Sequence, residues 1–226
     1  MKVGEGKARS AACPGGAPPT TIALMDSRRW DERYAGTDLL WSAEPNRFLV
    51  AEVAGLAPGR ALDVACGEGR NAVWLARQGW DVVGVDFSPV AIAKARRLAA
   101  HHGVEASWIV GDVAVGDLPA GPFDLVVVLY LHLPAPAMAE VLARAAARVG
   151  EGGTLVVVAH DETNIAEGHG GPQDPAVLYG PADVVRAIGE GFTIDRADRV
   201  RRSVETGGVT VDAVDCLVRA RRRLAP

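Results

Sequence analysis

A short glycine turn and a downstream acid have the chemistry of a nucleotide site. Gly67 and Gly69 lie in the sequence CGEG at 66–69, and the pattern G-x-G-x-x-A ends at Ala72. Glycine at such positions lets the backbone approach a ligand closely. Asp86 follows a second apolar run, where an acid accepts hydrogen bonds from ribose hydroxyls. The spacing fits both a nicotinamide dinucleotide and S-adenosylmethionine (SAM).

Two further acids favour the second ligand. Asp63 stands four residues before Gly67, inside the first apolar run. A fixed anion there would repel a pyrophosphate but would attract the ammonium and sulfonium charges of SAM. Asp112 follows a third apolar run, where it could accept a hydrogen bond from an adenine amino group. The three acids together predict SAM as the cofactor, although each alone could instead be a helix cap or a turn residue.

Candidate residues for the second substrate follow later apolar runs. His132 comes just after the run at 123–131, and His160 and Asp161 come just after the run at 153–159. Open α/β sheets bind ligands at the carboxyl ends of their strands, so we predict catalytic roles for these three residues. The alternative is a helix-cap neighbour for His132 and solvated turn residues for the others. A metal site of His160, Asp161 and His169 would lack recognisable metal-ligand spacing, so we expect no metal.

The composition predicts a folded protein whose partner is a small molecule. The chain has 226 residues, 49% of them hydrophobic, and a formal net charge of −4. This charge argues against nucleic acid as the main partner, because nucleic-acid binding is dominated by phosphate neutralisation. We interpret the arginines at 219–223 as the end of a strand and a solvated basic tail. The apolar stretch at 123–133 is too short to span a membrane.

Cysteine usage indicates the compartment. Cys13, Cys66 and Cys216 lie far apart and form no CxxC pair. Such usage is typical of a reducing compartment, so we predict a cytoplasmic protein. We separately expect either a monomer or a homodimer.

Alternating helical and apolar patterns predict one doubly wound α/β domain. We expect residues 1–25 to be a disordered lead and residues 26–226 to be the folded domain. The apolar runs do not alternate with polar residues, which indicates strands buried on both faces of a mainly parallel sheet. The last two strands are joined by a glycine turn without a crossover helix, so they should pair antiparallel. The predicted helices cover residues 27–35, 45–55, 70–78, 89–102, 135–149 and 181–189, and the predicted strands cover residues 61–66, 81–85, 106–110, 123–131, 153–159, 192–200 and 209–219.

Two segments resemble the first motifs of class I SAM-dependent methyltransferases. They are LDVACGEG at 62–69 and GVDFSP at 84–89. The order of elements is similar to that family across residues 26–219. WDERY at 30–34 and GRNA at 69–72 resemble the tellurite-resistance and thiopurine-methyltransferase-like branch. The resemblance implies a seven-stranded sheet and an N-terminal helix that closes over SAM.

The resemblance also implies roles for individual residues. Asp63 and the backbone of residues 67–69 would contact the methionine end of SAM, and Asp86 would contact the ribose. The adenine would lie against Asp112 and Val113, and the wall beneath the methyl group would be Leu129 and Tyr130. We predict further cofactor contacts from Cys66, Asn71 and Phe87. Trp30, Tyr34 and Trp41 would form an aromatic lid, although aromatic residues also serve as simple packing.

The predicted activity is methyl transfer from SAM to a small molecule. The acceptor could be a thiol, a chalcogen oxyanion, an amine or a hydroxyl. A hydroxyl would need a dedicated general base, whereas a thiolate or a chalcogen oxyanion would hardly need one. Two alternatives stay open at this point. One is an NAD(P)-linked oxidoreductase, which shares the glycine turn, and the other is a SAM-binding protein without catalysis.

Overall fold

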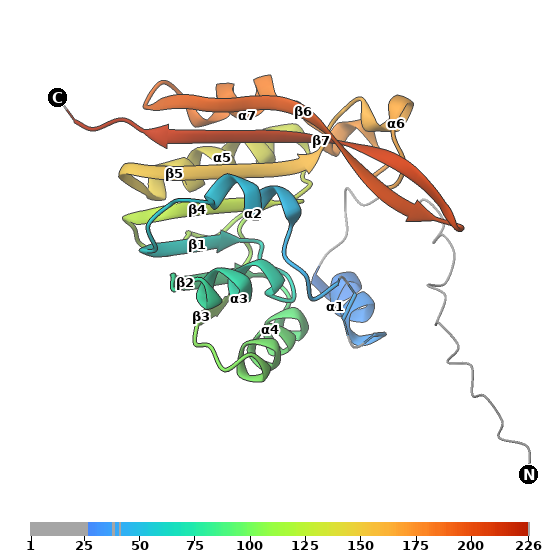
Figure 1. The fold of residues 1–226 in the computed structure, drawn as a ribbon, viewed down its shortest axis with the longest axis horizontal. Helices are drawn as coiled ribbons and strands as arrows, with labels where there is room; N and C mark the ends of the chain where they lie inside the picture. The colour runs from blue at the N-terminus through green and yellow to red at the C-terminus, as the bar shows by residue number, and fades with distance from the viewer. Residues whose placement is uncertain (1–26, 38, 41, 226) are drawn as a thin grey trace, which may run out of the picture.

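Seven strands form one mixed sheet at the centre of the molecule (Figure 1). The computed structural model describes residues 27–37, 39–40 and 42–225. The strand order is β3-β2-β1-β4-β5-β7-β6, so β1 to β3 extend the sheet to one side and β4 begins the other side. The strands are β1 (Arg60–Val64), β2 (Asp81–Asp86), β3 (Ser107–Val110), β4 (Phe123–Leu129), β5 (Val149–His160), β6 (Phe192–Thr206) and β7 (Val209–Arg222).

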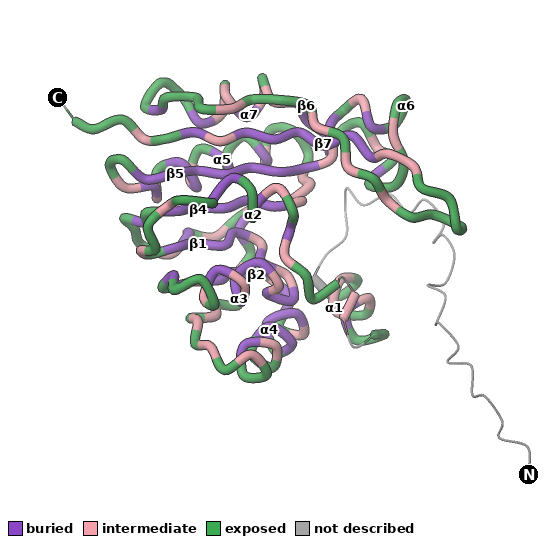
Figure 2. The backbone as a smooth tube through the Cα atoms, in the orientation of Figure 1, coloured by how far each residue is buried: buried purple, intermediate pink, exposed green. Residues whose placement is uncertain are grey.

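Strands β1 to β5 are parallel, and the central strands β1 and β4 are buried on both faces, whereas the edge strand β3 is mostly exposed. In β4, Val126 and Val128 belong to one apolar cluster, whereas Leu125 and Val127 belong to the other. Figure 2 shows the same pattern as buried chain along the middle of the sheet. The prediction of a doubly wound sheet from continuous apolar runs is therefore confirmed.

Helices cover both faces of the sheet. Leu49 and Leu75 bring α2 and α3 into one apolar cluster, and Leu142 and Val184 bring α5 and α7 into the other. The helices are α1 (Ser27–Ala35), α2 (Arg47–Val53), α3 (Arg70–Arg77), α4 (Pro89–His101), α5 (Ala135–Arg148), α6 (Asn164–Glu167) and α7 (Pro181–Ile188), with a short 3₁₀ turn η2 (Pro175–Val177). In the described part of the chain, no helix has the length and apolar character needed to cross a membrane.

Side-chain caps fix where two of these helices begin. The Asn46 side chain accepts hydrogen bonds from the backbone N–H groups of Phe48 and Leu49, so α2 begins at Arg47 rather than at the predicted residue 45. Ser88 caps α4 through the N–H of Ala91, and Pro89 takes the first helical position. The second cap holds the start of α4 directly after Asp86.

The last two strands form a long antiparallel hairpin, as predicted. Gly207 and Gly208 have φ values of 60° and 82°, which favour glycine and suit a tight hairpin turn. In Figure 1 the hairpin extends past the end of β5 near α6. Strand β7 also pairs with β5, and this register places His160 opposite Asp215.

The predicted basic tail is wrong in part. Strand β7 continues to Arg222, and two of its arginines bind carbonyl groups, whereas the Arg221 side chain is 57% exposed. Arg219 donates to the carbonyl of Glu52, and Arg222 donates to the carbonyl of Ala146. The segment after β5 contains α6 and η2, which sequence periodicity did not reveal because each is only one turn long.

Candidate active site

A cavity of about 600 Å³ opens at the carboxyl ends of the parallel strands. It runs from the glycine turn at one end, here called the cofactor end, to His132 and His160 at the other, here called the acceptor end. The predicted site residues that line it are Trp30, Tyr34, Cys66, Gly67, Asn71, Asp86, Phe87, Asp112, Val113, Leu129, Tyr130, His132 and His160. Their roles toward a ligand remain predictions. Trp41 lies outside the described residues.

The glycine turn has two different requirements for glycine. Gly67 has a φ of 55°, and a Cβ atom there would lie 3.2 Å from the Tyr34 hydroxyl. Gly69 has a φ of 80°, and its Cβ would lie 2.6 Å from the Ala95 side chain and 2.7 Å from Trp108. Gly69 does not line the cavity, so its small size serves the packing of the turn against α4 and β3.

Asp86 ties the glycine turn to the end of β2. Its Oδ2 accepts a hydrogen bond from the Gly67 N–H at 2.9 Å, and its Oδ1 accepts one from the Ser88 N–H at 2.9 Å. Burial raises the pKa of this carboxyl group, while the two backbone hydrogen bonds work in the opposite direction. Each carboxylate oxygen has a second lone pair, so Asp86 can accept ligand hydroxyls as well as hold the turn.

Asp63 lies beneath the turn rather than in the cavity wall. Its side chain is 1% exposed, and its Oδ2 has no hydrogen-bond partner among the described residues. Burial, and then the nearby charge of Asp86, raise its pKa to about 7. The predicted direct contact with a ligand is therefore not favoured by the geometry. Asp63 can act on a ligand through the electric field of its carboxyl group. A nearby cation would favour the ionised form and so lower its pKa.

The segment before α2 is fastened over the cofactor end by a buried ion pair. Lys94 Nζ lies 2.8 Å from Glu68 Oε1, and both side chains are at most 5% exposed. Lys94 also donates to the Thr37 carbonyl, and the Glu68 carboxylate accepts from the Leu40 N–H. The sequence did not predict this pair. Glu68 is an unspecified position of the G-x-G pattern, and Lys94 lies in a helix without a recognisable motif.

Helix α1 is fastened to the same end. Trp30 and Tyr34 pack with ring centroids 5.5 Å apart, and Tyr34 is buried. The Ser88 hydroxyl donates a short hydrogen bond to the Asp31 carboxylate. The predicted aromatic lid residues of α1 thus line the cavity beside the glycine turn.

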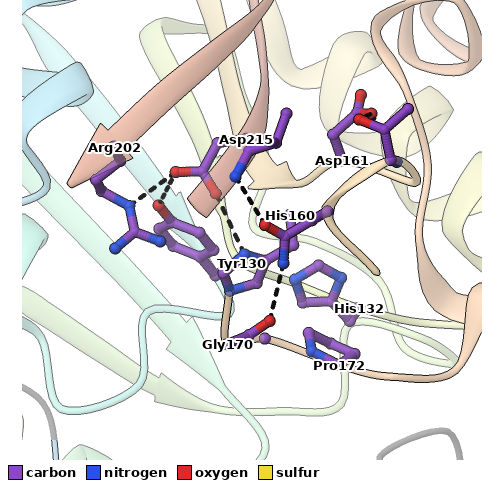
Figure 3. A network of polar contacts seen from close by, with 12 residues as sticks. Tyr130, His132, His160, Asp161, Gly170, Pro172, Arg202 and Asp215 are labelled. Carbon is purple, nitrogen blue, oxygen red and sulfur yellow. Dashed lines mark hydrogen bonds and ion pairs between the residues drawn. The ribbon is translucent and has the colours of Figure 1, made fainter. Parts of the chain in front are cut away.

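The acceptor end is organised by a carboxylate that sequence reasoning did not identify. Asp215 is fully buried on β7, and its Oδ2 accepts hydrogen bonds from Tyr130 Oη and Arg202 Nε, both at 2.8 Å (Figure 3). Its Oδ1 lies 3.2 Å from His160 Nδ1. Tyr130 has an unusual φ of 56°, which directs the chain away from β4 at the cavity wall.

His132 stacks beside His160 with ring centroids 5.5 Å apart. Its Nδ1 lies 3.1 Å from the carbonyl oxygen of Val177, so Nδ1 must carry the hydrogen. Burial, and then the neighbouring His160, lower the pKa of His132 to about 4. His132 is therefore a neutral wall residue at neutral pH, held by the loop that contains η2.

Asp161 lies outside the cavity lining despite the prediction of a catalytic role. It is fully buried, and its Oδ1 accepts hydrogen bonds from the Thr163 N–H and from Arg199 Nε. These contacts organise the turn after β5. Among the described residues, no group of three or more His, Cys, Asp or Glu side chains could hold a metal ion.

Four arginine side chains give the cavity a cationic wall. They belong to Arg33, Arg47, Arg70 and Arg202. Burial lowers the pKa of Arg70, and within the described residues its recorded hydrogen bond is a long one of 3.5 Å to Ser42 Oγ. Glu68, Asp86 and Asp112 line the same cavity, and Arg202 is paired with Asp215, so positive charge prevails only beside the arginines that have no carboxylate next to them.

Comparisons with known proteins agree with this geometry. Residues 61–153 match the family model described as "Methyltransferase domain". The chain is 37% identical over 97 residues to a demethylmenaquinone methyltransferase of Thermus thermophilus, covering 42% of each chain. It is 32% identical over 116 residues to a ubiquinone biosynthesis O-methyltransferase of Pseudomonas aeruginosa, covering 49% of this chain and 50% of the relative. The chain thus spans half or less of the length of these curated relatives.

Two solved structures share the fold over most of the chain. TehB from Haemophilus influenzae has a TM-score of 0.68 at 15% identity, covering 87% of this chain and 67% of TehB. The N-methyltransferase NodS from Bradyrhizobium japonicum, in complex with S-adenosyl-L-homocysteine, has a TM-score of 0.64 at 20% identity, covering 87% of this chain and 98% of NodS. At 15–20% identity, these two likenesses concern the fold alone. Residues 61–153 match the methyltransferase-domain model, and most of the chain shares its fold with solved methyltransferases such as NodS.

Proposed function

We propose that this chain transfers a methyl group from SAM to a small-molecule acceptor bound in the cavity described above. The observation that carries the proposal is one continuous cavity joining the glycine turn and Asp86 to the two histidines. Methyl transfer requires the donor and the acceptor to meet in line, away from water. A shared cavity with a separate end for each partner satisfies that requirement.

The residues at the cofactor end fit SAM better than a dinucleotide. Asp63 and Asp86 are buried carboxyl groups close to the glycine turn. A pyrophosphate against them would add like charge in a poorly solvated place, whereas the ammonium and sulfonium groups of SAM would be attracted. In this proposal Asp86 would contact the ribose, Asp112 and Val113 the adenine, and Asn71 with the turn backbone the methionine end.

The chain's own contribution to the reaction is alignment and proton handling. SAM supplies a methyl group bound to a positively charged sulfur. The neutral thioether that remains after transfer is a good leaving group. Leu129 and Tyr130 lie between the two ends and would set the line of approach. His160, which is partly exposed to the cavity, would accept a proton from the acceptor. Because Asp161 lies outside the cavity lining, we leave it out of the proposed catalytic group.

Two assays on the full chain test this function. Thermal-shift measurements should show a higher melting temperature with SAM and with S-adenosylhomocysteine but not with NAD or NADP. A radiolabelled methyl screen over thiols, amines, phenols and chalcogen oxyanions should then identify the acceptor. Stabilisation by NAD or NADP without stabilisation by SAM would overturn the proposal. SAM binding without methyl transfer to any acceptor would favour the non-catalytic alternative.

A further inference from the structure

A single buried carboxylate connects three elements at the acceptor end. Asp215 on β7 contacts Arg202 on β6, Tyr130 after β4 and His160 at the end of β5 (Figure 3). All three of these partners line the cavity, whereas Asp215 itself is 0% exposed. A buried carboxylate is costly unless its lone pairs are used. Here Oδ2 accepts two hydrogen bonds, and Oδ1 has an ion-pair contact of 3.2 Å with His160 Nδ1 but makes no hydrogen bond among the described residues.

The contacts keep Asp215 ionised. Burial works to raise the pKa of its carboxyl group, but His160 and Arg202 outweigh that effect, and the pKa lies below its ordinary value. Tyr130 donates its hydroxyl hydrogen to the same carboxylate, and burial followed by Asp215 raises the pKa of that hydroxyl. Tyr130 therefore stays protonated and is unsuited to act as a base.

An ionised Asp215 decides which nitrogen of His160 carries a hydrogen. The carboxylate lies 3.2 Å from Nδ1, which is close contact without a hydrogen bond, and it can only accept. It therefore favours the neutral tautomer with the hydrogen on Nδ1. Among the described residues Nε2 makes no hydrogen bond, and the side chain is 14% exposed. The other groups around the ring are the Tyr130 ring, His132, which is neutral, and the backbone of Gly171. Nε2 therefore offers a lone pair at the cavity.

We infer that Asp215, held by Arg202 and Tyr130, is a positioning residue that makes His160 a general base, and that the methyl acceptor is a weakly acidic hydroxyl of the phenol class. This inference rests on the proposed function. An acceptor that is already ionised at neutral pH needs no such base. Arg70, which lines the cavity close enough to Tyr130 and Arg202 to interact with them electrostatically, disfavours an ammonium group and stabilises the negative charge that develops on a phenolic oxygen.

The step balances without any added reactant. His160 Nε2 takes the hydroxyl proton while the acceptor oxygen forms a bond to the methyl carbon. The bond from that carbon to sulfur breaks, and the electron pair stays on sulfur. The products are a methyl ether, S-adenosylhomocysteine and a protonated His160, which returns its proton to solvent.

A second arginine and aspartate pair on the same strand provides a matched control. Arg199 Nε lies 2.8 Å from the fully buried Asp161, just as Arg202 Nε lies 2.8 Å from Asp215. Neither Arg199 nor Asp161 lines the cavity. Arg199→Gln and Arg202→Gln thus disturb similar ion pairs three residues apart, but only the second change touches the histidine.

The test measures kcat for a series of ring-substituted phenols, from unsubstituted phenol (pKa about 10, as for tyrosine) to phenols that are ionised at the assay pH. For the least acidic phenol, His160→Gln should lower kcat by about 10²- to 10⁴-fold. Asp215→Asn should lower it by about 10²-fold or more, because it disturbs the tautomer. These deficits should shrink toward none for phenols that are already ionised. Arg202→Gln should follow the same trend, and Arg199→Gln should match the wild type throughout.

Three results would overturn the inference. They are an equal deficit of His160→Gln across the whole series, an equal effect of the two arginine variants, and the absence of methylation of every phenol by a wild-type chain that binds SAM. The last result would leave the proposed function standing, whereas failure to bind SAM would remove both.

A readout without turnover covers variants that fold poorly. In ¹⁵N NMR spectra of the wild type above neutral pH, the His160 ring should be the Nδ1–H tautomer. In Arg202→Gln the Nε2–H tautomer should gain population, and in Arg199→Gln it should not. A wild-type ring protonated at Nε2 would contradict the role of Asp215 as the positioning residue.

Discussion

The two ends of the cavity are built in different ways. At the cofactor end, Asp86 accepts hydrogen bonds from Gly67, 19 residues before it, and from Ser88, 2 residues after it. Both partners belong to the same strand-turn-helix unit or to the next one. At the acceptor end, Asp215 meets Tyr130 across 85 residues, and β5 pairs with β7 to set His160 beside it. The cofactor end is therefore a local motif on parallel strands, whereas the acceptor end depends on the register of an antiparallel hairpin. One end can stay constant while the hairpin supplies a different acceptor chemistry.

The largest stability effect should come from the buried pair at the cofactor end. Glu68→Gln leaves the Lys94 ammonium buried without its charged partner, and breaking such a pair costs about 3–5 kcal/mol. The matched change Glu162→Gln breaks a half-exposed pair with Arg199 and should cost less than about 1 kcal/mol. Urea unfolding monitored by circular dichroism measures both free energies of unfolding. Equal losses in the two variants would show that the Lys94–Glu68 ion pair does not hold the segment before α2 in place.

A smaller effect with a defined pH dependence should come from Asp63. Its pKa is raised to about 7 in the folded chain from an ordinary value of 3.8, so the folded state binds the proton more tightly than the unfolded state. Its contribution to stability is therefore complete below about pH 4 and is lost as the pH rises from about 4 to about 7. The side chain of Asp63→Asn does not titrate, so its contribution to stability does not change with pH. The stability of this variant relative to the wild type should therefore increase across that window.

Urea unfolding of the SAM-free chain at about pH 5 and about pH 7.5 checks this expectation. His132 has a lowered pKa and therefore makes the opposite contribution, because the folded state loses stability as the pH falls through about 6.5 to 4. That contribution is common to both proteins and cancels in the comparison. A pH-independent difference would mean that Asp63 is ionised throughout, so that the cofactor end carries two buried charges.

The sequence predicted the cofactor end because its signals are short-range. The turn at 66–69, the acid at Asp86 and the continuous apolar runs lie within single units, and all of them have the expected secondary structure. Asp63 shows the limit of this reasoning. Spacing placed it correctly at the first strand, but spacing does not tell whether a side chain faces the cavity or lies under the turn.

The acceptor end could be predicted only in part. His132 and His160 were found because they follow strands, and they line the cavity. Asp215 and Arg202 lie inside the last two strands, where a polar residue looks like the solvent face of an ordinary hairpin. Only the pairing register reveals that they meet His160. Asp161 was predicted to be catalytic but does not line the cavity. Its position after a strand could not tell whether it belongs to a turn or to the cavity.

The smallest effect should come from the N-terminal segment. Residues 1–24 have no periodic apolar face, so we predict that their deletion leaves the melting temperature and the SAM affinity unchanged. Deletion through Tyr34 should instead weaken SAM binding, because Trp30 and Tyr34 line the cofactor end. Thermal melts and calorimetry on both truncated chains make the comparison. Loss of SAM binding in the shorter deletion would extend the cofactor end into residues 1–24.

Calorimetric titration of SAM into two single variants tests the separation of the two ends most directly. Asp86→Ala removes the proposed acceptor of ribose hydroxyls, which should cost about 1.5–3 kcal/mol per hydrogen bond and raise Kd by roughly tenfold to more than a hundredfold. His160→Gln changes the acceptor end alone and should leave Kd within about threefold of the wild type, a difference below about 0.7 kcal/mol. Thermal melts confirm that each variant is folded. The account predicts a weakened Asp86→Ala and an unchanged His160→Gln, and it is contradicted if SAM affinity is unchanged in Asp86→Ala or falls equally in both.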